Sequence, residues 1–518
     1  MKKHRRLLAL LMVFLLSLGS FAGTAIAEEE DKTVTIALAE NIFNLDPVNG
    51  TGMPFFITMK NCMEGLVYSN HDGTYEPLLA TSWEVSEDGL SWTFHLREGV
   101  KFHNGEDFTS ADVVGVFNRI LENGTSMNLY PQYWADLESV EAPDDYTVIL
   151  HTKVPMAYLL LSASQTLFYG DEAWAEYGER LFSEQKIWGT GPWVFQEWID
   201  SQYTKYIKNP DYWGKDFYDP YYETFYLRYV LEPSTAVAGH LAGDIDAYLA
   251  AGGISADMLP LYVGSEDRID LVRQETGSYQ FWGLNCAEDS PFHDINVRKA
   301  FSLAIDRQAI ADSIYGGNAV PLKSLMCMSI GWDPTLPDPE YNPELAKELL
   351  ANSSYNGEVI ELSSHTSTLK AEDSCLAVAD MLAQVGFNCT INVVENVVLT
   401  EMRSTGNYDA YMVTVMHEGA DPSSLMTQRV MLDAHKSSYI NEELNATIAA
   451  GNAEFDPEKR QELWEEANQI MLDEYAPHIP YLQLICTYAI DKGVTGLGMY
   501  PDGLLGTDRV DYDPSLAA

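Results

Sequence analysis

The sequence predicts an α/β protein with more than one domain. The chain has 518 residues, 46% of them apolar, so it can bury several hydrophobic cores. Helix and strand patterns alternate between residues 340 and 475, as they do in an α/β domain. Between residues 83 and 120, strands with a two-residue period lead into a helix. Together these observations predict a globular chain that combines sheets with helices.

The stretch from Trp83 to Ile120 is the most informative part of the chain. Residues 92–96 alternate between apolar and polar side chains, which predicts a strand with one face in a core. A second strand is expected at Val100–Phe102, between two glycine turns. Thr109 and Asp112 have the spacing of a capping box, so a helix should begin there.

Further elements follow the same two periods along the rest of the chain. Alternating side chains predict strands at 34–38, 146–151, 203–207, 247–249, 281–285, 359–362 and 389–393. Helical spacing predicts helices at 297–307, 343–350, 375–384 and from 457 to before 477. Two glycines and a proline in Gly189–Trp193 predict a tight turn beside core tryptophans.

The N-terminal segment has the pattern of an export signal. Four basic residues among the first six precede an apolar run at 7–18, and Ala25–Ala27 provides a small-residue cleavage site. The apolar run is shorter than the about 20 residues that a membrane-spanning helix needs. We therefore expect a signal peptide at 1–27, cleaved after Ala27, and an exported mature chain that does not insert into a membrane.

The composition is strongly acidic, with 77 Asp and Glu against 31 Lys and Arg and a formal net charge of −46. Such a charge keeps an exported protein soluble, which is the favoured interpretation, and it would also attract cationic ligands. Nucleic-acid binding is excluded, because it needs a basic patch and the sequence shows none.

Six cysteines lie far apart in the sequence and form no CxxC pair; they are Cys62, Cys286, Cys327, Cys375, Cys389 and Cys486. An exported chain could oxidise some of them, and the sequence does not select a pairing. A large core does not need disulfides, so buried thiols are also expected. Cys327 lies between two methionines, which could bind a soft metal, but core packing is favoured. We expect no metal site and no cofactor.

Enzymatic motifs are missing from the sequence. It contains no HExxH, no GxSxG, no GxxxxGKS and no GxGxxG after a predicted strand. Paired acids such as Asp144-Asp145 could suggest a glycosidase, but pairs arise by chance in so acidic a chain. We therefore expect that the protein is not an enzyme, with a secreted hydrolase as a remote alternative.

Two stretches contain strings of residues that identify a family. The strings in the first stretch are Asp88-Gly89, Leu96-Arg97, Gly99–Gly105 and Ala111–Val113. Those in the second are Asn285, Pro291-Phe292, Val297–Ala300 and Ala304–Arg307. Both closely resemble the signature of the family 5 extracytoplasmic solute-binding proteins, the dipeptide- and oligopeptide-binding components of ABC importers.

The resemblance implies a two-lobed α/β fold of the type II periplasmic-binding-protein kind, with an extra domain inserted in the first lobe. The ranges expected from it are lobe I at 28–62, 187–282 and 485–518, the inserted domain (domain II) at 63–186, and lobe III at 283–484. The chain should cross between the lobes at Ser278–Cys286 and return near Leu482–Tyr488.

The resemblance also implies a function. The protein would capture a small solute, with peptides as the favoured class, in a cleft between the lobes and deliver it to the membrane permease subunits of an ABC transporter. The alternative is the same role for an oligosaccharide or a metal chelate, since the 30 tyrosines would suit either kind of solute. The protein is expected to be a monomer.

One predicted binding residue is Glu418, which lies next to His417. Relatives that bind peptides place an acid for the ligand's ammonium group at the position of Glu418, and His417 would lie beside that ligand. Attraction between a carboxylate and an ammonium survives the exchange of aspartate for glutamate. The tryptophan of these relatives is replaced here by Val415, which weakens the case for peptides. A solvated loop acid is the alternative interpretation.

Three further residues are candidates through their position. His365 falls near the place where dipeptide binders have an arginine for the ligand carboxylate, although a structural histidine would look the same. Asn49 and Thr51 lie in the loop that borders the cleft in the family, and both can donate or accept hydrogen bonds. A plain turn is the alternative for this loop.

The expected location follows from the residue after the signal peptide. Many family members in bacteria with one membrane carry a lipid-modified cysteine at that point, but here the residue is Glu28 and the first cysteine is Cys62. We therefore expect no lipid-modified cysteine. The protein would be periplasmic in a cell with two membranes and extracellular, held by its transporter, in a cell with one.

Overall fold

The computed structural model describes residues 32–516 except 51, 71–73, 127, 129–132, 251–252, 417–420, 434 and 500–504. The chain divides into two units, Met1–Thr33 and Val34–Ala518, and the fold below is that of the second unit. We keep the names lobe I, inserted domain and lobe III for the ranges predicted above, whose exact bounds stay predictions.

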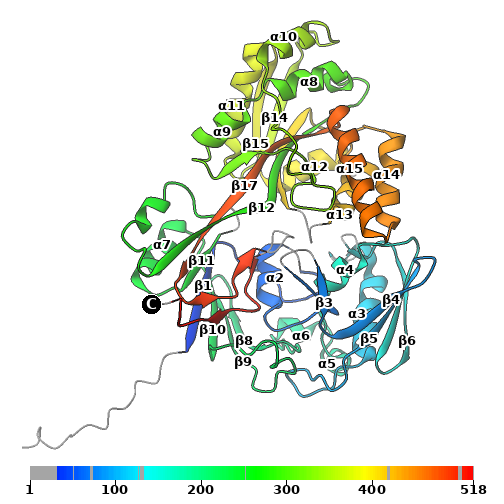
Figure 1. Cartoon of the computed structure of the whole chain (residues 1–518), viewed down its shortest axis with the longest axis vertical. Coiled ribbons are helices and arrows are strands. Elements are labelled where there is room, and N and C mark those ends of the chain that lie inside the picture. The colour runs from blue at the N-terminus through cyan, green and yellow to red at the C-terminus, as the bar shows by residue number, and fades with distance from the viewer. Residues whose placement is uncertain are drawn as a thin grey trace, which may run out of the picture. The chain divides into compact units, whose positions relative to one another are not determined.

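One mixed sheet of eleven strands runs through the second unit (Figure 1). Its order is β15-β14-β16-β12-β17-β11-β1-β10-β9-β8, and β13 pairs with β17. The strands are β1 (Thr33–Leu38), β8 (Trp193–Ile199), β9 (Tyr203–Lys208), β10 (Thr224–Tyr229), β11 (Ala247–Leu249), β12 (Ile269–Leu284), β13 (Ala319–Pro321), β14 (Val359–His365), β15 (Asn388–Val394), β16 (Ala410–Met416) and β17 (His478–Asp491). All the strands predicted for lobe I and lobe III are present.

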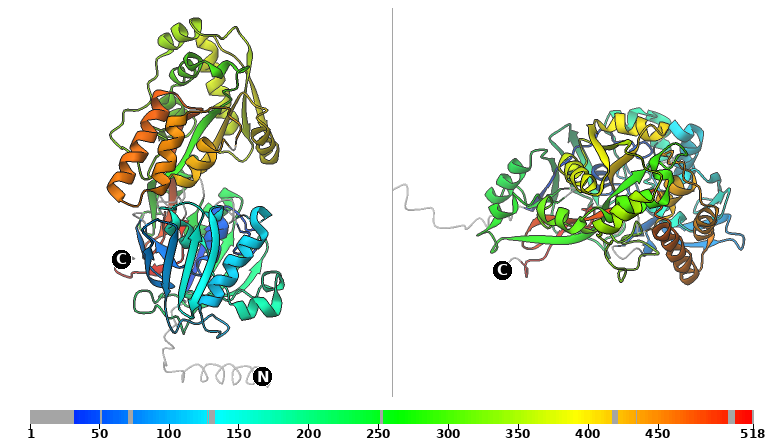
Figure 2. Two further views of the ribbon diagram at one scale, coloured as in Figure 1. Left: turned by 90° about the vertical axis from the view of Figure 1, so that its right-hand side faces the viewer. Right: turned by 90° about the horizontal axis from the view of Figure 1, so that it is seen from above.

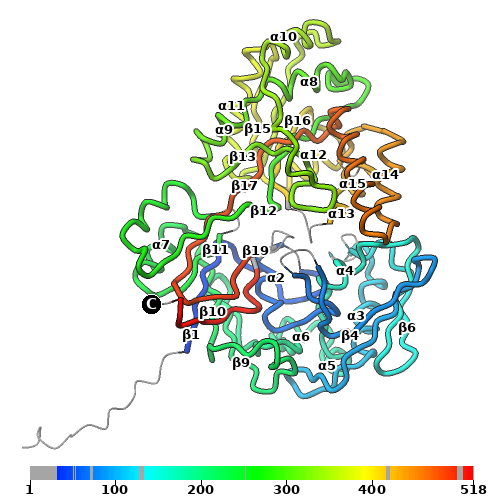
Figure 3. Tube along the Cα trace, viewed as in Figure 1, coloured from blue at the N-terminus to red at the C-terminus, as the bar shows by residue number. Residues whose placement is uncertain are grey.

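The long strands β12 and β17 connect lobe I to lobe III and lie side by side (Figure 3). Their antiparallel pairing is irregular between Glu275 and Tyr279. On the lobe I side β17 pairs with β11, and on the lobe III side it pairs with β13. Strand β12 begins to pair with β16 at Ser278. These changes of partner lie close to the two segments predicted for the crossing, whose exact position stays a prediction.

The inserted domain contains a second sheet, antiparallel, with the order β4-β5-β7-β6. Its strands are β4 (Ala80–Val85), β5 (Ser91–Leu96), β6 (Leu137–Asp144) and β7 (Thr147–Thr152). Trp92, Phe94 and Leu96 are buried, as their alternation predicts. Helix α3 (Ser110–Asn123) begins at the predicted capping box, where Asp112 accepts a hydrogen bond of 2.7 Å from the backbone nitrogen of Thr109.

The second strand predicted at Val100–Phe102 was wrong. Only Lys101 pairs there, in an isolated bridge to Asp107. Gly99 and Gly105 both have positive φ angles and reverse the chain on either side. The segment between these turns has too few residues to form a regular pair of hydrogen-bonded strands.

The remaining helices and hairpins of lobe I and the inserted domain are short. The helices are α2 (Met53–Met59), α4 (Leu159–Gln165), α5 (Asp171–Tyr177), α6 (Arg180–Ser183) and α7 (Pro233–Ala242). The paired short strands are β2 (Val67–Ser69) with β3 (Tyr75–Pro77), β18 (Val494–Thr495) with β21 (Asp511–Tyr512), and β19 (Gly498–Met499) with β20 (Leu505–Gly506). The red C-terminal hairpins lie against lobe I (Figure 2), where Tyr218 Oη donates to the Val510 carbonyl over 2.7 Å.

The turn predicted at Gly189–Trp193 is present, and close packing explains its glycines. A Cβ atom on Gly189 would lie 1.9 Å from the carbonyl oxygen of Cys62. No residue with a side chain fits at that distance, so the backbone of the turn can rest directly on the segment that follows α2. Trp193, which follows, is fully buried in the core of lobe I.

Lobe III surrounds its part of the main sheet with helices. They are α8 (Ile295–Leu303), α9 (Arg307–Ser313), α10 (Pro343–Ala351), α11 (Ala371–Val385), α12 (Asn396–Thr405), α13 (Ser423–Met426), α14 (Glu442–Ala453) and α15 (Pro457–Asp473). The single helix predicted at 297–307 is divided into α8 and α9. The division occurs because Asp306 caps the second helix, accepting a 2.9 Å hydrogen bond from the backbone nitrogen of Ala309.

The hydrophobic cores show how the parts are joined. One core holds lobe I and the inserted domain together, from Phe94 and Phe117 to Trp193 and Phe225. The sheet of lobe III has two cores, one that includes residues of α8 and α11 and another that includes residues of α14 and α15. Lobe I and the inserted domain therefore share a core, whereas lobe III is connected to them mainly through β12 and β17.

Candidate functional site

Lobe III also contacts the inserted domain, at a distance in sequence from the crossing strands. The ring of Phe455, in the turn between α14 and α15, lies 5.9 Å from the ring of Trp92. Nearby, the backbone nitrogen of Ala157 donates a 2.9 Å hydrogen bond to the carbonyl oxygen of Asn452. Figures 1 and 2 show this end of α14 and α15 beside the inserted domain. The lobes are thus joined both at the crossing and at this contact.

A buried ion pair holds the α14–α15 end of lobe III in place. Arg460 donates to both carboxylate oxygens of Asp421, over 2.7 and 3.0 Å, and to the carbonyl oxygen of Gly451 over 2.9 Å. Burial raises the pKa of Asp421, but the charge of Arg460 outweighs it and the net pKa is lowered. Asp421 therefore fixes α15 to the segment that follows β16.

The carboxyl ends of β14, β15 and β16 lie at the edge of the lobe III sheet where β12 enters from lobe I. Met416, at the end of β16, pairs with Ser278, and β14 runs parallel to both β15 and β16. In open α/β sheets this edge is where ligands bind. The predicted residue His365 ends β14 at this edge.

His365 is half-buried and its ring is engaged locally. Its Nδ1 lies 2.8 Å from Oγ of Ser367, and its Nε2 lies 3.0 Å from Oγ1 of Thr368. Burial, followed by the charge of Arg403, lowers the pKa of His365, so the neutral ring is favoured. A role for His365 in binding a ligand carboxylate stays a prediction.

The other predicted binding residues are only partly within the described chain. Thr51, His417 and Glu418 lie outside the described residues. Asn49 is described: its backbone nitrogen donates to the carbonyl of Asp46 over 3.1 Å, and its own carbonyl accepts from Asn128 over 2.8 Å. The structure does not bring Asn49 and His365 together among the contacts that it shows, and both roles stay predictions.

Asn49 lines a cavity of about 400 Å³ in lobe I and the inserted domain. Asp46 and Arg119, paired through two hydrogen bonds, form part of its wall. A cavity of this volume would hold a small molecule. Its described lining residues come from lobe I and the inserted domain alone, so it is separate from the edge that carries His365.

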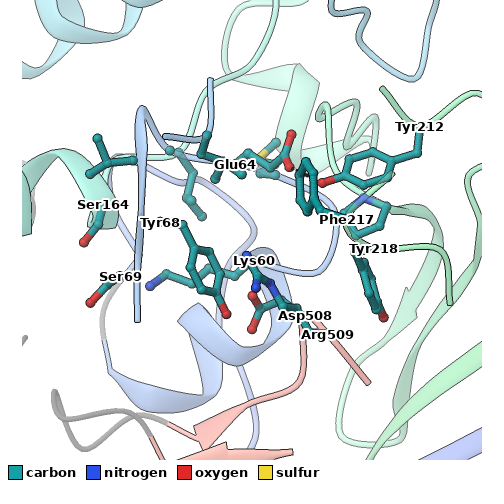
Figure 4. Close-up of a pocket in the computed structure, with 16 residues that line it drawn as sticks. Lys60, Glu64, Tyr68, Ser69, Ser164, Tyr212, Phe217, Tyr218, Asp508 and Arg509 are labelled. Carbon is teal, nitrogen blue, oxygen red and sulfur yellow. Dashed lines mark hydrogen bonds between the residues drawn. The ribbon is translucent and has the colours of Figure 1, made fainter. Parts of the chain in front are cut away.

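A smaller cavity of about 40 Å³ lies beside Glu64. Figure 4 shows Glu64 and Tyr212 on one side of it and Tyr68, Asp508 and Arg509 on the other. The carboxylate of Glu64 accepts hydrogen bonds of 2.7 to 2.8 Å from Thr190, Tyr212 and Trp213.

Burial raises the pKa of Glu64 to about 7, against the effect of these donors. Sequence reasoning did not identify Glu64 as a common partner of three motifs. Of these segments, Glu64-Gly65-Leu66, Gly189–Trp193 and Asn209–Trp213, only the turn at Gly189–Trp193 is among the elements predicted above. The structure brings them together on one carboxylate.

Three general findings bear on chemistry and location. All six cysteines are free, and five of them are buried. Within the described ranges, no three or more His, Cys, Asp or Glu side chains are grouped so that they could hold a metal ion. Among the same residues, no helix combines the length and the apolar character that crossing a membrane requires.

Two of the curated proteins that this chain resembles are described by what they bind. Over 467 residues, this chain is 28% identical to heme-binding protein A of Haemophilus influenzae, covering 83% of this chain and 82% of that protein. Over 495 residues, it is 25% identical to the glutathione-binding protein GsiB of Salmonella paratyphi A, covering 93% and 94%.

Comparison of structures confirms the fold. The periplasmic binding protein DppA of Helicobacter pylori, solved in complex with the peptide STSA, matches with a TM-score of 0.76 at 22% identity, covering 93% of this chain and 98% of that one. The predicted two-lobed type II periplasmic-binding-protein fold is therefore confirmed. Residues 74–431 match the family described as bacterial extracellular solute-binding proteins, family 5, middle region. The chain belongs to this family, the extracytoplasmic solute-binding proteins of ABC transporters.

Proposed function

We propose that the protein captures peptides between lobe I and lobe III and delivers them to the permease subunits of its transporter. The observation that supports this is the joining of the lobes at two places, the β12–β17 crossing and the contact of Phe455 with Trp92. A solute between the two places would be enclosed when the second contact forms. The name of the glutathione-binding relative and the peptide bound by DppA favour a peptide as the solute.

The crossing strands have the features of a hinge. Their pairing shifts between Glu275 and Tyr279 and again between Gln280 and Phe281. Irregular ladder positions can change their backbone angles without disturbing a regular sheet, which suits a domain closure around a ligand. The contact at Phe455 would then be the part that opens.

The test is native mass spectrometry of the mature protein, purified from its natural host without unfolding, followed by calorimetry with the identified solute. A retained species with the mass and fragmentation pattern of a peptide supports the proposal. The alternative outcome is a retained species that gives no amino-acid fragments and whose binding is confirmed by calorimetry. That result would contradict the peptide class and leave the solute-binding role in place.

A metal chelate is the second candidate solute. The similarity to heme-binding protein A over 83% of the chain favours it. A protein purified with a bound porphyrin would absorb strongly in visible light, whereas one with a bound peptide would not. An absorption spectrum of the same preparation therefore separates the two classes.

Export and processing complete the proposal. We propose a signal peptide at 1–27 and a monomeric mature protein that begins at Glu28, without a lipid-modified cysteine. The intact mass of the mature protein tests this directly. A mass that includes a diacylglycerol group, or an N-terminus other than Glu28, would contradict it.

A further inference from the structure

Two arginines of lobe III lie on the same side of its sheet, next to the crossing strands. Arg403, near the end of α12, has its guanidinium carbon 5.5 Å from the centre of the Tyr411 ring. Arg429 has its guanidinium carbon 5.3 Å from the centre of the Phe281 ring. The rings of Phe281 and Tyr411 are 6.0 Å apart, edge to face. The two guanidinium groups thus flank a pair of aromatic rings on β12 and β16.

Both arginines have buried nitrogens without a hydrogen-bond partner. They are Nε of Arg403 and Nη1 of Arg429. Among the described residues, the one hydrogen bond of either side chain runs from Nη2 of Arg403 to Oγ1 of Thr400, at 3.2 Å. Within the described part of the chain, neither arginine forms an ion pair. Buried donors in this state cost free energy unless a ligand satisfies them.

Four other arginines of the described chain, all more deeply buried than the half-buried Arg403 and Arg429, are well supplied with hydrogen bonds. Each of the others donates at least three hydrogen bonds to carboxylate, carbonyl or hydroxyl oxygens; they are Arg119, Arg298, Arg307 and Arg460. The fold therefore satisfies a buried guanidinium elsewhere with its own oxygens. At Arg403 and Arg429 the described residues supply almost none.

Two histidines lie beside the arginines, in a chain whose net charge is −46, and the neutral form of both rings is favoured. His435 Nδ1 lies 2.9 Å from the hydroxyl of Tyr411, and the ring of His478 lies 5.0 Å from that of Phe281. Burial and then the two arginines lower the pKa of His435 to about 2. Burial and then Arg429 lower that of His478 to about 3.

Asp433, an acid whose charge acts on Tyr411, is already occupied. Asp433 accepts hydrogen bonds from the backbone nitrogens of Ser437 and Ser438 and from the hydroxyl of Ser437, over 2.6 to 2.9 Å. Its carboxylate is therefore committed to the turn that follows it. The positive potential at Arg403 and Arg429 is left for another anion.

We propose that Arg403 and Arg429 form a binding site for an oxyanion, and that its occupant is a carboxylate group of the captured solute. A carboxylate has two oxygens that accept from guanidinium nitrogens, and the resulting charge-assisted bonds would satisfy both unpartnered donors. Phe281 and Tyr411 form the floor of the site, and Tyr411 holds His435 at its side. The choice of a carboxylate rests on the proposed function, whereas the oxyanion site rests on the arginines alone.

The test uses sulfate as the probe on the full mature chain. The variants are Arg403→Gln and Arg429→Gln, and the matched control is Arg228→Gln, an exposed arginine on β10. Thermal unfolding is followed against sodium sulfate, with sodium chloride at equal ionic strength as the reference. We expect a saturable sulfate-specific rise of the unfolding midpoint in the wild type and in Arg228→Gln. In the two site variants the sulfate dissociation constant should rise at least tenfold.

Two further readouts separate a binding role from a structural one. Without sulfate, Arg429→Gln should unfold at the wild-type temperature or above, because the substitution removes a repulsion between two cations. If Arg429 had only a structural role, the variant would unfold at a lower temperature than the wild type. In crystals soaked with selenate, an anomalous peak should lie between the two guanidinium groups. No peak, or the same sulfate response in all four proteins, overturns the site.

The carboxylate assignment is tested by competition, using tetra-alanine and its C-terminal amide. If tetra-alanine displaces sulfate and the amide does so at least tenfold more weakly, both the site and the peptide function are supported. If sulfate binds at the arginines but neither peptide displaces it, the oxyanion site stands as an inorganic-anion site and its assignment to the peptide carboxylate is overturned. If tetra-alanine binds equally well to Arg429→Gln, the peptide function is supported and the site is overturned.

Discussion

At the scale of single residues, Glu64 shows how one buried carboxylate connects segments that are far apart in the sequence. Its donors come from the turn before β8 and from the loop after β9, and its own backbone lies just beyond α2. Tyr212 and Thr190 bond different oxygens of the carboxylate. The carboxylate therefore fixes the loops of lobe I to the start of the inserted domain.

Replacing Glu64 with alanine should destabilise the protein by about 2–4 kcal/mol, because three buried donors lose their acceptor. Glu64→Gln should cost less, since the amide oxygen can still accept from Thr190 and Trp213. Denaturant unfolding of the three proteins measures the difference. Equal free energies of unfolding for the wild type and Glu64→Ala would show that water replaces the carboxylate without loss.

Glu64 should also make the stability depend on pH. Its folded pKa is about 7, above the usual value for glutamate, so between about pH 4.5 and 7 the folded state holds a proton that the unfolded state has lost. Stability contributed by this group should then fall as the pH rises through that window, by about 3 kcal/mol at most. The comparison is with Glu64→Gln, which lacks the titration. A constant difference between the two proteins from pH 5 to 7.5 would contradict the raised pKa.

At the scale of elements, the turn between α14 and α15 is the part of lobe III that contacts the inserted domain. Phe455→Ala should weaken solute binding by up to about tenfold, because the closed form loses a ring contact worth about 0.5–1.5 kcal/mol. Val263→Ala is the control, since Val263 is 78% exposed and lies in lobe I. Calorimetry with the solute found by mass spectrometry measures both. Equal affinities for the two variants would show that the contact does not assist closure.

Local patterns predicted elements well where the signal is local. The alternation of Trp92, Phe94 and Leu96 and the capping box of α3 both depend on neighbouring residues, and both were confirmed. The division between α8 and α9 also has a local signal, because Asp306 is a good N-cap residue, but the helical spacing on either side concealed it.

Features that depend on the assembled fold had no such signal. Phe455 meets Trp92 across more than 360 positions of sequence, and Arg403 approaches Arg429 only because α12 and the segment after α13 cover the same face of the sheet. The predicted residues Asn49 and His365 came from the family resemblance instead. That resemblance located loops, and it could not show that both ring nitrogens of His365 have local partners.

At the scale of the whole molecule, the distribution of charge is uneven in a way that composition conceals. The chain has 77 acidic residues, yet the charged side chains with buried, unpartnered atoms in the described part of lobe III are two arginines. A negative surface repels other anions at long range, so an anionic group reaches the arginines only as part of a solute that the protein binds through other contacts as well. Capture would then depend on closure of the lobes, which brings those contacts together.

Closure should therefore be measurable as a change in size. We expect the radius of gyration from small-angle scattering to fall when the identified solute saturates the protein, because the lobes rotate about β12 and β17 while each keeps its own core.

The hydrogen bond of 2.9 Å between Ala157 and Asn452 offers a way to fix the closed form. In an Ala157→Cys/Asn452→Cys variant, oxidation should give the smaller radius without solute, and reduction should restore the larger one. The six native cysteines interfere little, since five are buried. Three radii are compared: that of the oxidised variant without solute, that of the reduced variant without solute, and that of the protein with saturating solute. If all three are the same, the lobes do not move.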